Sequence, residues 1–242
     1  MATFDAGSSD DVTAISLTIA HTISGAGNPA LYVGVAGNQA VNPLSVIWNV
    51  TETMTETVVR TNSVNDRVHI FERAAPTTGT ANYVILYASS QEICAVGLSA
   101  TDCHQTTPTE TSGGATTTTT SLSTDLGAVA STSLLFDMEV NDSDKSASLA
   151  AGADQTVVGV IRVSPLGLTG AGSRQAGSAG GVMSWSWTGN ESSAMVAVSI
   201  QSPAATFDPA LMAAMSRPRP DIVFHRPTVV ASGMTPPSQL PT

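Results

Sequence analysis

The sequence predicts an all-β protein: a two-sheet antiparallel β-sandwich of jelly-roll type, followed by an extended proline-rich C-terminal arm. Three observations support this prediction. Short strand-like segments recur at near-regular spacing, turn-forming residues separate them, and no segment before residue 205 has a convincing helical period. This arrangement is typical of sandwiches and jelly rolls.

The first predicted strand has the alternation expected of a strand with one buried face. Ile15, Leu17, Ile19, His21 and Ile23 alternate with small or hydroxyl-bearing residues. Because successive side chains of a strand point to opposite faces, we expect these five residues on the core side. Further strands are predicted at residues 31–36, 44–50, 67–71, 83–87, 93–98, 134–140, 157–163, 182–187 and 195–200, with weaker candidates at 57–60 and 116–122.

Glycine, proline and asparagine gather between the predicted strands. We expect turns or loops there, because these residues adopt the backbone conformations that turns require. The threonine run 116–120 stays inside the domain, since β-branched threonine suits an exposed or edge strand. The predicted turn segments are 24–29, 37–43, 76–80, 141–145 and 167–181, the last of which holds six glycines.

The composition limits the function. Of the 242 residues, 42% are hydrophobic and only 12% are charged, which suits a β-rich secreted or virion protein. The net charge of −10 argues against nucleic acid as a partner, because phosphate contacts need clustered cations. The N-terminus has neither a basic start nor an apolar stretch, and no apolar run of about 18 residues occurs. We therefore expect no signal peptide and no transmembrane segment.

The composition changes near residue 203, which divides the chain into a predicted sandwich domain, 1–205, and an arm, 206–242. Seven of the thirteen prolines lie in the arm. Proline at this density prevents helices and central strands. The arm carries three arginines and two aspartates, a net charge of +1, which leaves −11 on the preceding part.

Two segments of the arm are candidates for binding a partner. Residues 208–216 predict one or two helical turns, with Asp208 as N-cap and Pro209 at the first helical position. Residues 221–225 form a short apolar segment that could add to a sheet edge. The alternative is a disordered tail. The predicted partner-binding residues are Leu211, Met215, Arg217, Arg219, Ile222, Phe224 and Arg226.

The sequence contains no nucleophile elbow, phosphate-binding loop or zinc-binding spacing, and it predicts no enzyme. The four histidines lie far apart, and we expect His21 and His69, which fall on strand patterns, to be structural. Cys94 and Cys103 are expected to be reduced, because two cysteines cannot form a disulfide framework.

The acidic stretch 137–144 has two interpretations. Its alternating oxygen ligands resemble a calcium loop, but it lacks the glycine turn and the distal glutamate of an EF-hand. We therefore expect Asp137 and Glu139 to face water and residues 141–144 to form a turn. The residues expected to face the core are Phe136, Met138 and Val140.

Two tryptophans also have two interpretations. Trp185 and Trp187 would point to the same face of a strand, as in a carbohydrate-binding platform. Aromatic residues make up only 5% of the chain, however, which is meagre for a sugar-binding module. We expect both tryptophans in the core.

Several segments match a known pattern when they are taken together. They are ALYVGV (30–35), VIWN (46–49), VHIF (68–71) with AAPTTG (74–79), AVGLS (95–99), QTTP (105–108) and LLFD (134–137). Over roughly residues 12–200 the chain resembles β-sandwich modules of bacteriophage virion proteins and of some bacterial surface proteins. The resemblance implies a jelly-roll or lectin-like sandwich without catalytic motifs. The arm resembles the extended arms of capsid cement and decoration proteins.

These expectations together predict a structural virion protein, a decoration or cement protein on the outer capsid surface of a phage. Its expected partners are the major capsid protein or another virion protein and neighbouring copies of the chain, with no nucleic acid and no membrane. Many weak contacts through an arm would stabilise a particle. One alternative is a receptor- or carbohydrate-binding module of a tail fibre or adhesin, with a patch near Trp185 or in residues 167–181. A hydrolase without local motifs is a third.

Overall fold

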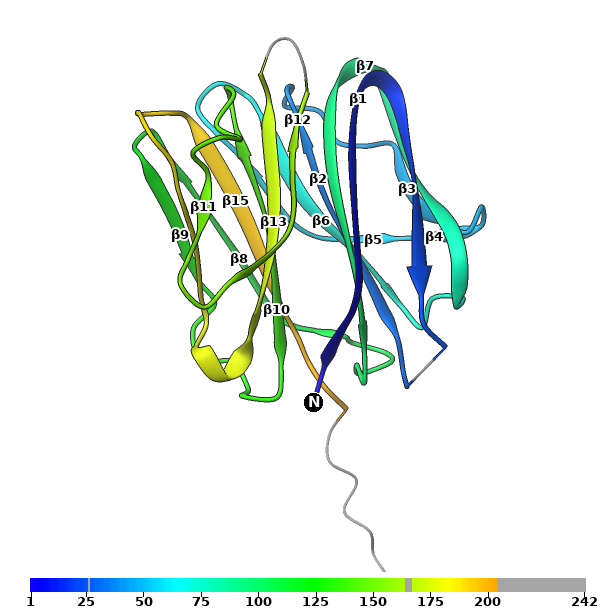
Figure 1. The fold of residues 1–242 in the computed structure, drawn as a ribbon. Coiled ribbons are helices and arrows are strands. Elements are labelled where there is room, and N and C mark those ends of the chain that lie inside the picture. Colours follow the sequence, from blue (N-terminus) through cyan, green and yellow to red (C-terminus); the bar gives the residue numbers. More distant parts are fainter. Residues whose placement is uncertain (26, 164–166, 204–242) are drawn as a thin grey trace, which may run out of the picture. The chain divides into compact units, whose positions relative to one another are not determined.

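The computed structural model describes residues 1–25, 27–163 and 167–203, and these form an all-β sandwich, as predicted (Figure 1). Every strand pairing in these ranges is antiparallel. The elements are β1 (Thr3–Ile23), β2 (Ala30–Gly37), β3 (Ser45–Trp48), β4 (Glu52–Thr53), β5 (Thr55–Thr61), β6 (Arg67–Ala74), β7 (Gly79–Thr101), β8 (Thr109–Thr117), β9 (Ser121–Asp125), β10 (Leu134–Asn141), β11 (Ala150–Ala151), β12 (Thr156–Arg162), β13 (Thr169–Ala176), the 3-10 helix η1 (Gly177–Ala179), β14 (Val182–Ser186) and β15 (Ser193–Ile200).

The described strands form three sheets. Sheet A has the order β4-β3-β7-β2-β6-β5, with β1 paired to β7. Sheet B has the order β12-β13-β10-β15-β8, and the small sheet C has the order β11-β14-β9. Sheet C is an addition to the two sheets that the sequence predicts.

Sheet A folds over itself because its two longest strands turn a corner together. In the β1–β7 ladder, Ala14 pairs with Gln91 and Ser16 pairs with Leu86, so residues 87–90 of β7 stand opposite Ile15 alone. Extra residues of this kind bend a strand pair. Beyond the corner, the second part of β1 and the first part of β7 join β3 and β4 in an outer layer.

Three apolar cores separate four layers. One core lies between the two layers of sheet A, one between sheets A and B, and one between sheets B and C (Figure 1). Strands β2 and β15 are buried along their whole length because both faces cover a core. Their sequences are continuously apolar or small, as expected for strands covered on two sides. The core within sheet A contains Trp48 and Tyr83. The core between sheets A and B contains Tyr32 and Phe136, and the core between sheets B and C contains Leu135 and Trp185.

Most predicted strands lie within observed ones, and three predictions need correction. Residues 83–87 and 93–98 belong to one strand, β7, which continues around the corner. Residues 116–122 are not one strand, because they contain the end of β8, the turn 118–120 and the start of β9. Of the residues assigned to the core face of β1, Leu17, Ile19, His21 and Ile23 are buried, but Ile15 is exposed because it lies at the corner.

The glycine-rich segment 167–181, predicted as a loop, contains a central strand of sheet B. Strand β13 pairs with β12 on one side and with β10 on the other. A Cβ atom on Gly170 would lie 2.7 Å from the Cβ of Cys94, and one on Gly172 would lie 2.9 Å from a methyl group of Val96. The glycines therefore allow sheets A and B to approach closely.

The described residues belong to one compact unit that extends from Met1 to Ala204. The predicted arm, 206–242, with all seven predicted partner-binding residues, lies outside the described residues. The predictions made for the arm therefore stay predictions. No helix in the described ranges is long and apolar enough to cross a membrane.

Candidate functional site

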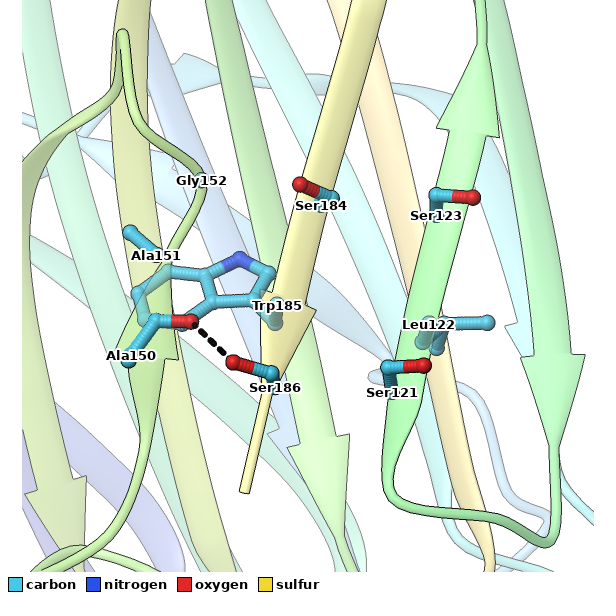
Figure 2. Close-up of a pocket in the computed structure, with 9 residues that line it drawn as sticks. All are labelled: Ser121, Leu122, Ser123, Ala150, Ala151, Gly152, Ser184, Trp185 and Ser186. Carbon is cyan, nitrogen blue, oxygen red and sulfur yellow. Dashed lines mark hydrogen bonds between the residues drawn. The ribbon is translucent and has the colours of Figure 1, made fainter.

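The outer face of sheet C carries a shallow depression of about 320 Å³ (Figure 2). Strands β9 and β14 each place two serines on this face, and the register sets Ser123 opposite Ser184 and Ser121 opposite Ser186. Ala150 of β11 pairs with Ser186 on the other side. The alternation of the strands turns Leu122 and Trp185 toward the core, so the exposed lining consists of hydroxyl groups and small side chains.

Two carboxyl groups lie beneath sheet C, on the face of β10 that covers the third core. Asp137 and Glu139 are both completely buried. The prediction that they face water is wrong, because sheet C covers the face of β10 that a two-sheet sandwich would leave exposed. The opposite face of β10 is as predicted, with Phe136, Met138 and Val140 in the core between sheets A and B.

Asp137 is surrounded by hydrogen-bond donors. Its Oδ1 accepts hydrogen bonds from the backbone N (2.7 Å) and Oγ (2.9 Å) of Ser173. Its Oδ2 accepts hydrogen bonds from Trp185 Nε1 (3.0 Å) and Gln155 Nε2 (3.1 Å). Burial raises the pKa of Asp137 to about 7, although these hydrogen bonds act in the opposite direction. Donors on all sides leave no room for a cation.

Glu139 is less well satisfied than Asp137. Its Oε2 accepts a hydrogen bond from Asn141 Nδ2 (2.7 Å), whereas its buried Oε1 has no partner among the described residues. Burial, and next the neighbouring Asp137 carboxyl group, raise the pKa of Glu139 well above its ordinary value. Burial therefore favours the protonated form of Glu139.

Hydrogen bonds connect the depression to the carboxyl group beneath it. Gln155 Oε1 accepts a hydrogen bond from the backbone N of Ser184 (2.7 Å), while its amide group donates to Asp137. Neither Asp137 nor Glu139 lines the depression. The depression thus offers hydroxyl groups to a ligand and no acid or base, which suits binding of a neutral polar group and not proton transfer.

The two strand histidines have separate buried environments. His21 Nδ1 lies 2.8 Å from Ser8 Oγ, and burial lowers the pKa of His21 to about 4. His69 Nδ1 lies 2.8 Å from Glu56 Oε2, and burial lowers the pKa of His69 although Glu56 opposes the shift. No three His, Cys, Asp or Glu residues in the described ranges are grouped so that they could hold a metal ion.

The interpretation of the two tryptophans as core residues is confirmed. Trp185 is 1% exposed and Trp187 is 5% exposed. Cys94 and Cys103 are unpaired, as predicted, and both are buried. Sequence reasoning missed the serines of the depression, whose signal is the alternation of serine with large apolar residues in SLSTD and VMSWS.

No protein family matches this chain, and neither does any curated protein or solved structure.

Proposed function

We propose that this chain is a non-catalytic structural protein of a virus particle. In this proposal the β-sandwich decorates the outer surface of a capsid. Residues 206–242 attach it to the major capsid protein, to another virion protein or to a neighbouring copy.

The observation that carries the proposal is that the described residues form a sandwich with three apolar cores of their own. The chain is then held where it leaves β15, because Gln201 N donates to Pro108 O (2.8 Å) and His104 N donates to Gln201 O (3.0 Å). The apolar and arginine side chains predicted to bind a partner follow this point in the sequence, in residues 206–242.

The charge distribution also supports attachment through the arm. Three of the six basic side chains in the body already pair with carboxylates, in the pairs Arg73–Glu52, Lys145–Glu191 and Arg162–Asp144. The arm holds three further arginines and has a net charge of +1, in contrast to −11 on the body. An acidic body that displays a basic arm would present the arm to an acidic partner surface.

Co-sedimentation with virus particles tests the proposal. Particles from a culture that produces this protein are stripped of it and exposed either to the full chain or to residues 1–205. We expect the full chain to sediment with the particles and the shortened chain to remain in solution. Circular dichroism should show the same β structure for both. Equal binding by the shortened chain would refute the role of the arm, and absence of the full chain from particles would refute decoration.

Matched arginine variants separate the role of charge from that of chain length. Replacing the three arm arginines with alanine should weaken particle binding at least tenfold, a loss of about 1.4 kcal/mol. Replacing three arginines of the body should leave binding unchanged. The arm arginines are Arg217, Arg219 and Arg226, and the body arginines are Arg60, Arg73 and Arg162.

The depression on sheet C favours a second candidate, a receptor- or carbohydrate-binding module. Its uncharged, hydroxyl-rich lining suits a neutral sugar, which would bind by hydrogen bonds because Trp185 and Trp187 are too deeply buried for stacking. Glycan-array binding that is lost in Ser186→Lys and retained in Val160→Lys, on the distant strand β12, would support this candidate. An array without any bound glycan would exclude it.

A further inference from the structure

A second cavity, of about 270 Å³, lies at one end of the core between sheets A and B. It is lined by the start of β1, the start of β10 and the end of β13. Ala2, Phe4 and Leu134 on its wall belong to this core or pack against it. Arg174 is the only charged side chain among the described residues that line the cavity.

Arg174 lies on a strand face that otherwise covers an apolar core. Gly170 and Gly172 share this face of β13 and approach side chains of sheet A. The register places Arg174 beside Phe136, which belongs to the same core. A charged group next to apolar surface is costly unless other contacts compensate for the water that it loses. The contacts of Arg174 therefore decide what this residue does.

The guanidinium group of Arg174 stacks on an aromatic ring and keeps its donors free. Its Cζ atom lies 4.2 Å from the centroid of the Phe4 ring. Stacking uses the face of the guanidinium group, whereas its five N–H donors lie in its plane and point outward from its edge. No described residue accepts a hydrogen bond from these donors or forms an ion pair with them. Every other basic side chain of the described body has such a partner; these side chains are Arg60, Arg67, Arg73, Lys145 and Arg162.

The carboxylate group beside the cavity is bound elsewhere. Glu110 Oε2 accepts hydrogen bonds from Ser133 Oγ (3.1 Å) and Ser199 Oγ (3.2 Å), and Glu110 forms no ion pair with Arg174. Ser133 lines the cavity, so Glu110 is held at its edge. The cavity thus combines an apolar wall with a cation that no described carboxylate neutralises.

We propose that this cavity binds the carboxylate group of a ligand that carries a small apolar group. The donors of a guanidinium group match the two oxygens of a carboxylate in a bidentate pair. One guanidinium group in a body with a net charge of −11 favours a single negative charge over the double charge of a phosphate. Phe4 and Leu134 favour an aliphatic group next to the carboxylate. A short-chain aliphatic acid and the C-terminal residue of a peptide share this chemistry.

The small size of such a ligand sets the expected affinity. Small ligands gain a limited free energy per atom, so we expect a dissociation constant on the order of 1 mM for butyrate. The attraction between Arg174 and the carboxylate is screened by salt, and binding should weaken as sodium chloride is added.

An NMR titration of the full chain at neutral pH and constant ionic strength tests the proposal. Butyrate is added up to about 20 mM, roughly twenty times the expected dissociation constant. We expect saturable shifts of the Arg174 Nε–H signal and of the backbone amides of Phe4 and Leu134. Butyramide has the same shape without the charge and should cause no such shifts.

Matched variants test the role of Arg174. Arg174→Gln should raise the dissociation constant for butyrate at least tenfold. The control is Arg60→Gln, which removes the same charge from an exposed side chain that donates to the backbone oxygens of Val59 and Gly114. It should bind butyrate like the wild type. Ala176→Glu, at an exposed position on the cavity wall, adds a competing carboxylate and should also weaken binding at least tenfold, which keeps the test decisive if Arg174→Gln fails to fold.

A tripeptide that ends in valine distinguishes the two sources of the carboxylate. Binding at least tenfold tighter than that of butyrate, and lost when the peptide is amidated, would assign the site to the C-terminus of a partner protein. Weaker binding than that of butyrate would assign it to a free acid. The proposal is overturned if butyrate causes no saturable shift, if butyramide binds equally well, or if Arg174→Gln binds like the wild type. No virus particle enters the titration, so this proposal and that of decoration can fail separately.

Discussion

Glu139 buries a carboxyl oxygen that meets no hydrogen-bond donor in the described part of the body, beside a second buried carboxyl group, Asp137. Removing a carboxylate from water without compensating partners is costly, and the cost is avoided when the group keeps its proton. The folded state therefore binds protons that the unfolded chain releases. Stability must then decrease with rising pH over the range in which only the unfolded state has lost them.

We expect the free energy of unfolding to fall as pH rises above the ordinary pKa of glutamate, by up to about 1.4 kcal/mol per pH unit for one proton. The ordinary pKa of glutamate is 4.5, and that of Glu139 is raised well above it. Its stabilisation is thus complete below the ordinary value and is lost as pH approaches the folded value. Urea unfolding at several pH values measures this slope, and Glu139→Gln should flatten it.

Other groups also change protonation on unfolding, so the comparison of Glu139→Gln with wild type isolates the contribution of Glu139. The raised pKa values of Asp66 and Asp137, about 6 and about 7, act in the same direction as that of Glu139, whereas the pKa of His21, lowered from 6.5 to about 4, acts in the opposite direction. Asp144→Asn is the control, because the pKa of Asp144 is lowered from its ordinary value. An equal slope in Glu139→Gln and wild type would contradict the prediction.

Alternation along β10 correctly separates its two faces but cannot show what covers each of them. The pattern places Phe136 and Met138 on one face and Asp137 and Glu139 on the other, as in a strand with one face in the core and one face in water. The covering of that side depends on β9 and β14, which pair only with each other and with β11. Such contacts between distant segments leave no periodic signal. The sequence feature that comes nearest to indicating this cover is Trp185. A buried indole N–H needs a hydrogen-bond acceptor, and Trp185 Nε1 donates to Asp137.

At the scale of elements, β13 shows how strand signals can be hidden. Its sequence, TGAGSRQA, contains no large apolar residue, although its first five residues are buried. β-propensity reflects packing of side chains on a pleated surface, and here the packing atoms come from the neighbours Cys94 and Val96. Glycine in a strand often marks close approach of another segment, and that interpretation applies here.

Gly170→Ala should destabilise the body by about 1–3 kcal/mol, the usual cost of overfilling a packed core. The added methyl group would meet Cys94 Cβ at 2.7 Å and Met138 Cε at 2.9 Å. The matched control is Gly25→Ala, since no atom lies within 4 Å of its added methyl group. We expect the control to change stability by less than about 0.5 kcal/mol. Equal urea midpoints for the two variants would show that sheets A and B separate easily.

At the scale of the whole molecule, the all-β class followed from local patterns, whereas the number of layers did not. The sequence predicts segments 83–87 and 93–98 as two separate strands. In the structure they form one strand, β7, which bends at the same place as its partner β1. The outer layer of sheet A was hidden for the same reason. Thr18, Ile47 and Val84 become neighbours only through pairings across the fold. The predicted arm and its residues were chosen from composition alone and await experiment.

The position of β15 has a consequence for synthesis. It is the last strand of the described body, yet it lies inside sheet B, between β10 and β8. While the chain is made, one edge of β10 therefore has no partner until residue 200 has left the ribosome. The strand β15 must therefore insert between β10 and β8 after both of these strands have been made.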